Sequence, residues 1–152
     1  MIQRIQSVYL FLVTVLLVVA MCTPVGRFVE ADGVTTHVFN PSGLTMADGT
    51  FQSTWGLLGI LLICALISLC TIFLYRNRML QIRMTVFGAL LLIGYYVVFG
   101  VFLYALKDAM PATNFRIAWT LSFPLIGVIL DYLAFRAIYR DEIMVKAADR
   151  LR

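Results

Sequence analysis

The chain has 152 residues, of which 62% are hydrophobic and only 13% are charged. Soluble domains are about 45–50% apolar and about 25% charged, so this composition excludes an ordinary water-soluble domain and indicates a membrane protein. The net charge is +4, but the basic residues stand in small groups between long apolar runs. That arrangement argues against nucleic-acid binding, which needs basic residues gathered on one water-facing surface.

Four apolar runs follow one another along the chain, at residues 5–23, 55–75, 84–106 and 117–139. A helix of about 20 residues crosses the roughly 30 Å of hydrocarbon in a bilayer. Because hydrocarbon offers no water, every backbone N–H and C=O group must be satisfied within the chain, as a helix does. The sequence therefore predicts an all-α membrane protein, with four transmembrane helices in a single domain over residues 1–152.

The first run also has features of a signal peptide, because Arg4 precedes a short apolar stretch. However, Met21 stands where a cleavage site before Cys22 needs a small residue. We expect a retained helix.

Residues 25–54 form the longest polar connection, between the first and second predicted helices. Two β-prone segments, Arg27–Glu30 and Val34–Phe39, flank Asp32-Gly33, and Asp48-Gly49 is a further turn sequence. Asp-Gly between β-prone segments is a strong hairpin signal. We expect a small β-hairpin that lies over the ends of the helices.

The basic residues are distributed unequally between the two sides of the predicted bundle, and the richer side of a membrane protein faces the cytoplasm. Nine lie on one side: Arg4, Arg76, Arg78, Arg83, Arg136, Arg140, Lys146, Arg150 and Arg152. Three lie on the other side: Arg27, Lys107 and Arg116. We therefore expect both termini in the cytoplasm and the 25–54 loop outside.

Residues 140–152 are predicted to form a helical tail. Ile143, Ala147 and Leu151 fall on one face, and Glu142 and Lys146 form an i,i+4 ion pair in the favourable order. The tail is either an extension near the lipid headgroups or a docking helix for a partner.

Three segments on the predicted cytoplasmic side, Met1–Tyr9, Ile72–Arg83 and Leu133–Arg152, resemble a family of small bacterial membrane proteins, domain of unknown function 4293. The resemblance implies a four-span protein of the bacterial inner membrane. It implies no activity, ligand or partner, so no functional residue is transferred from it. It directs attention to the cytoplasmic rim, where the three segments would meet.

Asp131 is the most informative single residue, because it lies inside the fourth apolar run. An ionisable group there costs about 2.5–3.5 kcal/mol on insertion scales, so it should face the bundle. We expect hydrogen-bond partners among Tyr9, Ser68 and Thr71, so that Asp131→Leu would lower stability. An interhelix polar contact, a proton or ion pathway and an interface with another protein are the alternatives.

Five arginines complete the candidate site: Arg76, Arg78, Arg83, Arg136 and Arg140. The first three form the densest basic group, which anionic headgroups attract by about 1 kcal/mol per charge. We expect these three, Arg4 and the tail to converge on one surface, with at least one ion pair between the tail and the middle loop or N-terminus.

No cofactor or metal is expected, because His37 is the only histidine and the three cysteines lie in apolar runs without ligand spacing. The same scarcity argues against an enzyme. The leading hypothesis is a non-enzymatic accessory or scaffold protein that contacts lipid and another membrane protein, or a second copy of itself. The alternative is a small transporter or proton-coupled channel using Asp131.

Overall fold

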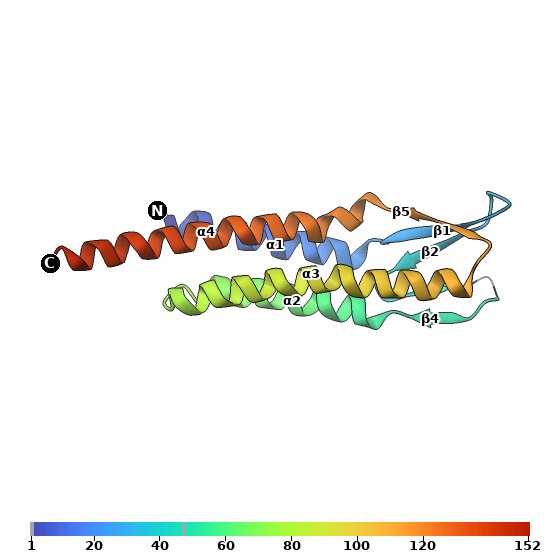
Figure 1. The fold of residues 1–152 in the computed structure, drawn as a ribbon, viewed down its shortest axis with the longest axis horizontal. Helices are drawn as coiled ribbons and strands as arrows, with labels where there is room; N and C mark the ends of the chain where they lie inside the picture. Colours follow the sequence, from blue (N-terminus) through green and yellow to red (C-terminus); the bar gives the residue numbers. More distant parts are fainter. Residues whose placement is uncertain (1, 47) are drawn as a thin grey trace.

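The computed structural model describes residues 2–46 and 48–152 of the chain. Within these residues it contains four long helices: α1 (Ile2–Cys22), α2 (Trp55–Phe73), α3 (Arg78–Ala109) and α4 (Ser122–Arg150). Each helix is long and apolar enough to cross a membrane. The helices run alternately up and down, and both ends of the chain lie at the same end of the bundle (Figure 1).

The helices form a bundle whose outer surface is largely apolar. α1 packs against α2 and α4, and α3 packs against the same two helices, so α1 and α3 face each other across the core. Only 22–33% of the most apolar window of each helix is buried inside the protein. The remaining apolar surface has no protein cover, which is typical of helices surrounded by lipid. The predicted bundle of four apolar helices is confirmed.

A five-stranded antiparallel sheet covers the end of the bundle opposite the termini (Figure 1). Its strands stand in the order β4-β3-β2-β1-β5. Their bounds are β1 (Gly26–Glu30), β2 (Thr36–Asn40), β3 (Gly43–Thr45), β4 (Phe51–Ser53) and β5 (Thr113–Ile117). The predicted hairpin is the β1–β2 pair, and the same loop continues into β3 and β4.

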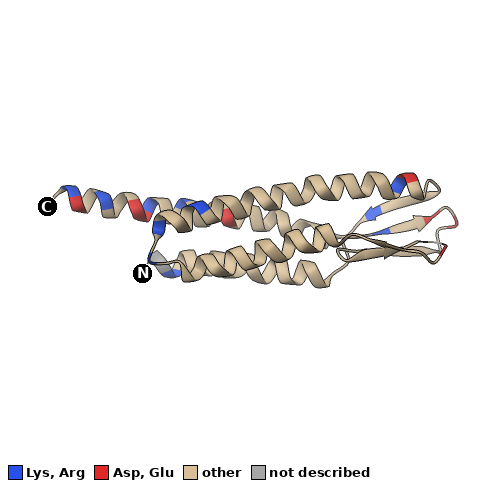
Figure 2. Ribbon diagram, turned by 90° about the horizontal axis from the view of Figure 1, so that it is seen from below, with Lys and Arg blue, Asp and Glu red and all other residues tan. Residues whose placement is uncertain are grey.

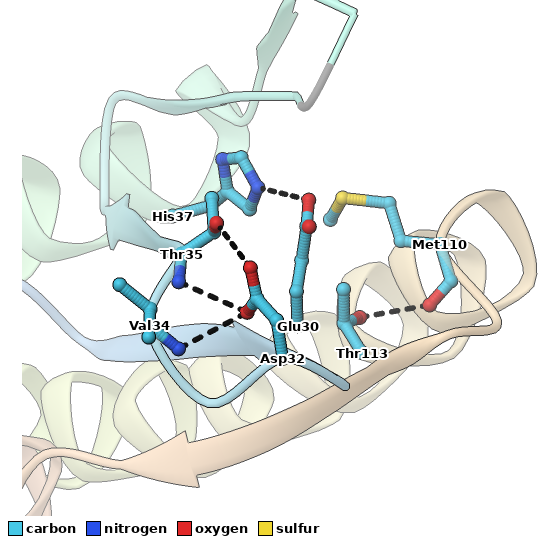
Figure 3. A network of polar contacts seen from close by, with 7 residues as sticks. All are labelled: Glu30, Asp32, Val34, Thr35, His37, Met110 and Thr113. Carbon is cyan, nitrogen blue, oxygen red and sulfur yellow. Dashed lines mark hydrogen bonds and ion pairs between the residues drawn. The ribbon is translucent and has the colours of Figure 1, made fainter.

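The turn between β1 and β2 is built on Asp32 (Figure 3). The carboxylate accepts hydrogen bonds from the backbone N–H groups of Val34 and Thr35, at 3.0 and 3.1 Å, and from the Thr35 hydroxyl at 2.8 Å. These bonds favour the charged form and lower the pKa of Asp32, with the backbone bond from Thr35 contributing most. Gly33 follows with φ of 73°, a left-handed conformation that favours glycine.

The fourth helix begins later than predicted. Residues 113–117, the last of which was assigned to that helix, instead form β5, which pairs with β1 in the register Phe28↔Phe115 and Arg27↔Arg116. Without β5 the edge of β1 would be left with unpaired backbone groups. The later start also places Pro124 in the first turn of α4, where the missing backbone N–H of proline costs the helix no hydrogen bond.

The third helix begins earlier than predicted, at Arg78 instead of residue 84. The connection between α2 and α3 is therefore a tight turn over residues 74–77, and Arg78 and Arg83 belong to the helix. By contrast, the predicted helical tail is confirmed, because α4 continues unbroken to Arg150. Its last turns extend beyond the other helices (Figure 1).

Candidate functional site

An open groove of about 750 Å³ lies at the end of the bundle that carries the termini. It separates the α2–α3 turn and the start of α3 from the projecting part of α4. Its polar lining combines both signs of charge, from Arg76, Asn77, Arg78, Arg83, Glu142, Lys146 and Asp149. The predicted convergence of the middle segment and the tail is confirmed. We call this feature the rim groove.

Two ion pairs involve residues of the tail beside the rim groove. Nη1 of Arg78 lies 3.7 Å from Oδ2 of Asp141, which confirms the predicted ion pair between the middle segment and the tail. This separation is too long for a hydrogen bond, and Nη1 of Arg78 has no hydrogen-bond partner among the described residues. Glu142 and Lys146 form the predicted i,i+4 pair at 3.0 Å.

The remaining predicted arginines lie outside the rim groove. Arg136 is exposed on α4, and Arg140 lines a separate pocket with Ile5 of α1 and Asp141. The expected single surface is thus two surfaces on different sides of α4, and Arg4, which is exposed on α1, lines neither of them. The larger one joins α3 to the tail, and the smaller one joins the start of α1 to the tail.

Asp131 is 2% exposed, so the prediction that it faces the bundle is confirmed. Its Oδ2 atom, however, has no hydrogen-bond partner among the described residues, so the expected partner for this oxygen was wrong. The reason is local: the Thr71 hydroxyl donates to the carbonyl of Ile67, one turn earlier in its own helix, at 2.6 Å. Threonine in a helix commonly uses its hydroxyl this way.

A groove of about 260 Å³ between α3 and α4 reaches Asp131. Apart from Thr85 and Asp131 its lining is apolar and aromatic, and the Thr85 hydroxyl donates to the carbonyl of Gln81 at 2.9 Å. Several lining side chains, including Leu90 and Tyr132, are exposed on the outer surface of the bundle. The groove therefore opens toward the side of the bundle, where lipid would lie.

Two glutamines that the sequence did not predict to be buried, Gln6 on α1 and Gln81 on α3, lie buried near the same end of the bundle. Together with Ser68, Thr71, Thr85 and Asp131 they supply buried polar side chains from all four helices. Nε2 of Gln6 has no hydrogen-bond partner among the described residues. Both glutamines stand among other polar residues, Gln6 between Arg4 and Ser7 and Gln81 between Arg78 and Arg83, so no local pattern marks them as buried.

His37 lies in the sheet and contacts Glu30, with Nε2 of the ring 3.0 Å from the carboxylate (Figure 3). This pair links β1 to β2 beside the turn. Within residues 2–46 and 48–152, no group of three His, Cys, Asp or Glu residues is placed to hold a metal ion.

A family model matches nearly the whole chain. The family model described as "Domain of unknown function (DUF4293)" matches residues 2–151. The chain belongs to this family. No curated protein matches it. The match covers all four helices and the sheet, and it includes the three segments that carry the resemblance except for the terminal residues Met1 and Arg152. The family's description names no function.

Proposed function

We propose that this chain is a non-enzymatic accessory or scaffold subunit that binds another membrane protein through its tail and the rim groove. The observation that supports the proposal is the exposed apolar surface of the tail. Ile143 and Met144 are each 51% exposed and Leu151 is 90% exposed. Exposed apolar side chains on a projecting helix mark an interaction site.

The length of α4 favours a docking helix over an extension lying along the membrane surface. α4 has 29 residues, which span about 43 Å at 1.5 Å per residue. Hydrocarbon is only about 30 Å thick, so the last turns of a straight helix extend beyond it. A partner that covers these turns would contact both the apolar face of the tail and the mixed charges of the rim groove.

The test removes the apolar tail surface without shortening the bundle. Ile143→Ser together with Leu151→Ser should reduce recovery of the associated membrane protein about tenfold, because two exposed anchor side chains are lost. The measurement is quantitative co-purification in mild detergent. Val34→Ser is the matched control, since Val34 is 84% exposed at the opposite end. Thermal unfolding should be unchanged in all variants.

Deletion of residues 146–152 provides a second variant with the same expected loss of association. If association persists in both variants, the tail is not the docking surface. If the variants unfold, the tail is part of the bundle's own stability and the proposal loses its surface.

We propose that the protein lies in a bacterial inner membrane with both termini in the cytoplasm. The basis is the unequal distribution of basic residues, which gather at the end with the termini (Figure 2). A fluorescent protein fused after Arg152 should fold and fluoresce in the cytoplasm. Alkaline phosphatase inserted at Val34 should be active, because it folds outside. The reverse pattern would overturn this orientation.

Asp131 supports a second candidate function, a small transporter or proton-coupled channel. A buried carboxyl group with a free acceptor atom is a candidate proton site in a membrane helix. This candidate rests on one residue, because no second carboxylate of the described chain lies buried in the bundle. A single carboxylate makes no relay, so the accessory role is the stronger proposal.

A further inference from the structure

Two arginines stand side by side at the sheet end of the bundle. Arg27 on β1 and Arg116 on β5 are direct cross-strand partners. Both side chains are exposed, and the flanking Gly26 and Phe28 of β1 are buried, so Arg27 and Arg116 share the outward face of the sheet. Cross-strand partners have Cβ atoms about 4.5–5.5 Å apart, and like charges at that distance are destabilising.

Nothing in the described part of the chain neutralises this pair. Neither arginine takes part in the ion pairs found there. Glu30 is engaged by His37, and Asp32 and Asp48 accept hydrogen bonds within their own turns. Asp108, in the last turn of α3, is exposed and forms no ion pair with either arginine. The juxtaposed positive charges therefore lack an anion that the fold itself could supply.

A pocket of about 620 Å³ joins the two arginines to the neighbouring membrane boundary. It extends from Thr23 and Pro24, which directly follow α1, to residues 116–120, which run from the end of β5 toward the start of α4. Two hydrogen bonds hold these walls together. The Thr120 hydroxyl donates to the carbonyl of Pro24 at 2.6 Å, and the N–H of Ala118 donates to the carbonyl of Val25 at 3.1 Å.

Apart from Thr23 and Thr120, the rest of the pocket lining is apolar, and the pocket is open. Trp119 is 77% exposed and Ile117 is 67% exposed. Exposed tryptophan at the end of a membrane helix is typical of the headgroup level, where its ring is apolar and its N–H is polar. Arginine side chains are long enough to keep their charged ends at the same level. The pocket thus combines a basic pair with apolar walls at the membrane boundary.

We propose that Arg27 and Arg116 bind the phosphate group of a membrane lipid in the leaflet on the sheet side. The planar guanidinium groups can each present paired N–H donors to phosphate oxygens. The pocket's apolar walls would contact the glycerol and upper acyl carbons, and the acyl chains would continue along α1 and α4. The phosphate would supply the negative charge that the cross-strand arginines lack.

The probe for the test is dioleoyl phosphatidic acid, added to the full chain in a neutral maltoside micelle. A Trp55→Phe background leaves Trp119 as the single tryptophan, so its fluorescence reports occupation of the pocket. In this background, Arg27→Gln and Arg116→Gln should each weaken binding by about tenfold or more, because each removes charged hydrogen bonds. Lys107→Gln is the matched control, since it removes an exposed positive charge at the same end but outside the pocket. It should leave binding unchanged.

Two further probes identify the source of the phosphate. Dioleoylglycerol, which has the same acyl chains without phosphate, should bind at least about tenfold more weakly. Inorganic phosphate should not displace the lipid at millimolar concentration. Equal binding of dioleoylglycerol would show an apolar groove only, and displacement by inorganic phosphate would show a site for a free anion. Either result overturns the proposal.

Stability without lipid separates binding from a structural role. Because substitution of one arginine relieves like-charge repulsion, the lipid-free thermal midpoint of Arg27→Gln or Arg116→Gln should be unchanged or raised. A clear fall in that midpoint would assign the arginines to the sheet's own stability. An equal loss of lipid binding in Lys107→Gln would show that the lipid responds only to the overall positive charge at this end of the protein. Both outcomes would overturn the proposal.

Discussion

Phe39→Ala should lower the free energy of unfolding by about 3–5 kcal/mol, the cost of removing a buried aromatic ring. Phe39 is fully buried on the inner face of β2. Its ring stacks on that of Phe99 in α3, with centroids 6.0 Å apart, and also contacts the rings of Phe28 and Phe115. The substitution would therefore weaken the packing of the sheet on the bundle.

Thermal or denaturant unfolding of the Phe39→Ala variant in detergent measures this effect. Phe51→Ala is the matched control, because Phe51 is a strand phenylalanine of the same sheet that is 61% exposed. The control should cost about 1 kcal/mol or less. Equal costs for the two variants would contradict the conclusion that the aromatic cluster joins the sheet to the helices.

Asp131→Leu should raise the free energy of unfolding by about 1–3 kcal/mol, the penalty of a buried polar atom without a hydrogen bond. Oδ2 of Asp131 has no partner among the described residues, and the groove of about 260 Å³ beside it accommodates the larger side chain. From the sequence we expected Asp131→Leu to lower stability, because we expected hydrogen-bond partners for Asp131 on the neighbouring helices. Asp108→Leu, at an exposed position near the end of α3, should have little effect.

The same position separates the two candidate functions. Asp131→Asn keeps the shape of the side chain and removes its titratable proton. If reconstituted protein shows a proton flux that Asp131→Asn abolishes while stability is unchanged, the transporter replaces the accessory subunit as the proposed function. If Asp131→Leu instead destabilises the protein, the conclusion that the unpartnered Oδ2 of Asp131 lowers stability is contradicted.

The helices and the main turns follow from local physics that the sequence carries by itself. Apolar runs in hydrocarbon must become helices, because no other backbone conformation satisfies its own hydrogen bonds there. Asp32-Gly33 and Asp48-Gly49 specify turns through positive φ at Gly33 and Gly49 and through the hydrogen-bonding aspartates before them. The inward orientation of Asp131 agrees with the cost that a carboxyl group would have on the lipid-facing side of a helix apolar enough to cross a membrane.

Only the tertiary structure decided which distant segments lie together. β5 is a five-residue strand shortly before a helix. Its sequence pattern is too short to separate it from the apolar run that follows, so only its pairing with β1 identifies it as a strand. The same register brings Arg27 beside Arg116, which no local pattern predicts. The sequence also did not predict that Oδ2 of Asp131 lacks a hydrogen-bond partner among the described residues. The hydroxyls of Thr71 and Thr85 donate to carbonyls of their own helices, and the choice between such local bonds and interhelix bonds depends on packing.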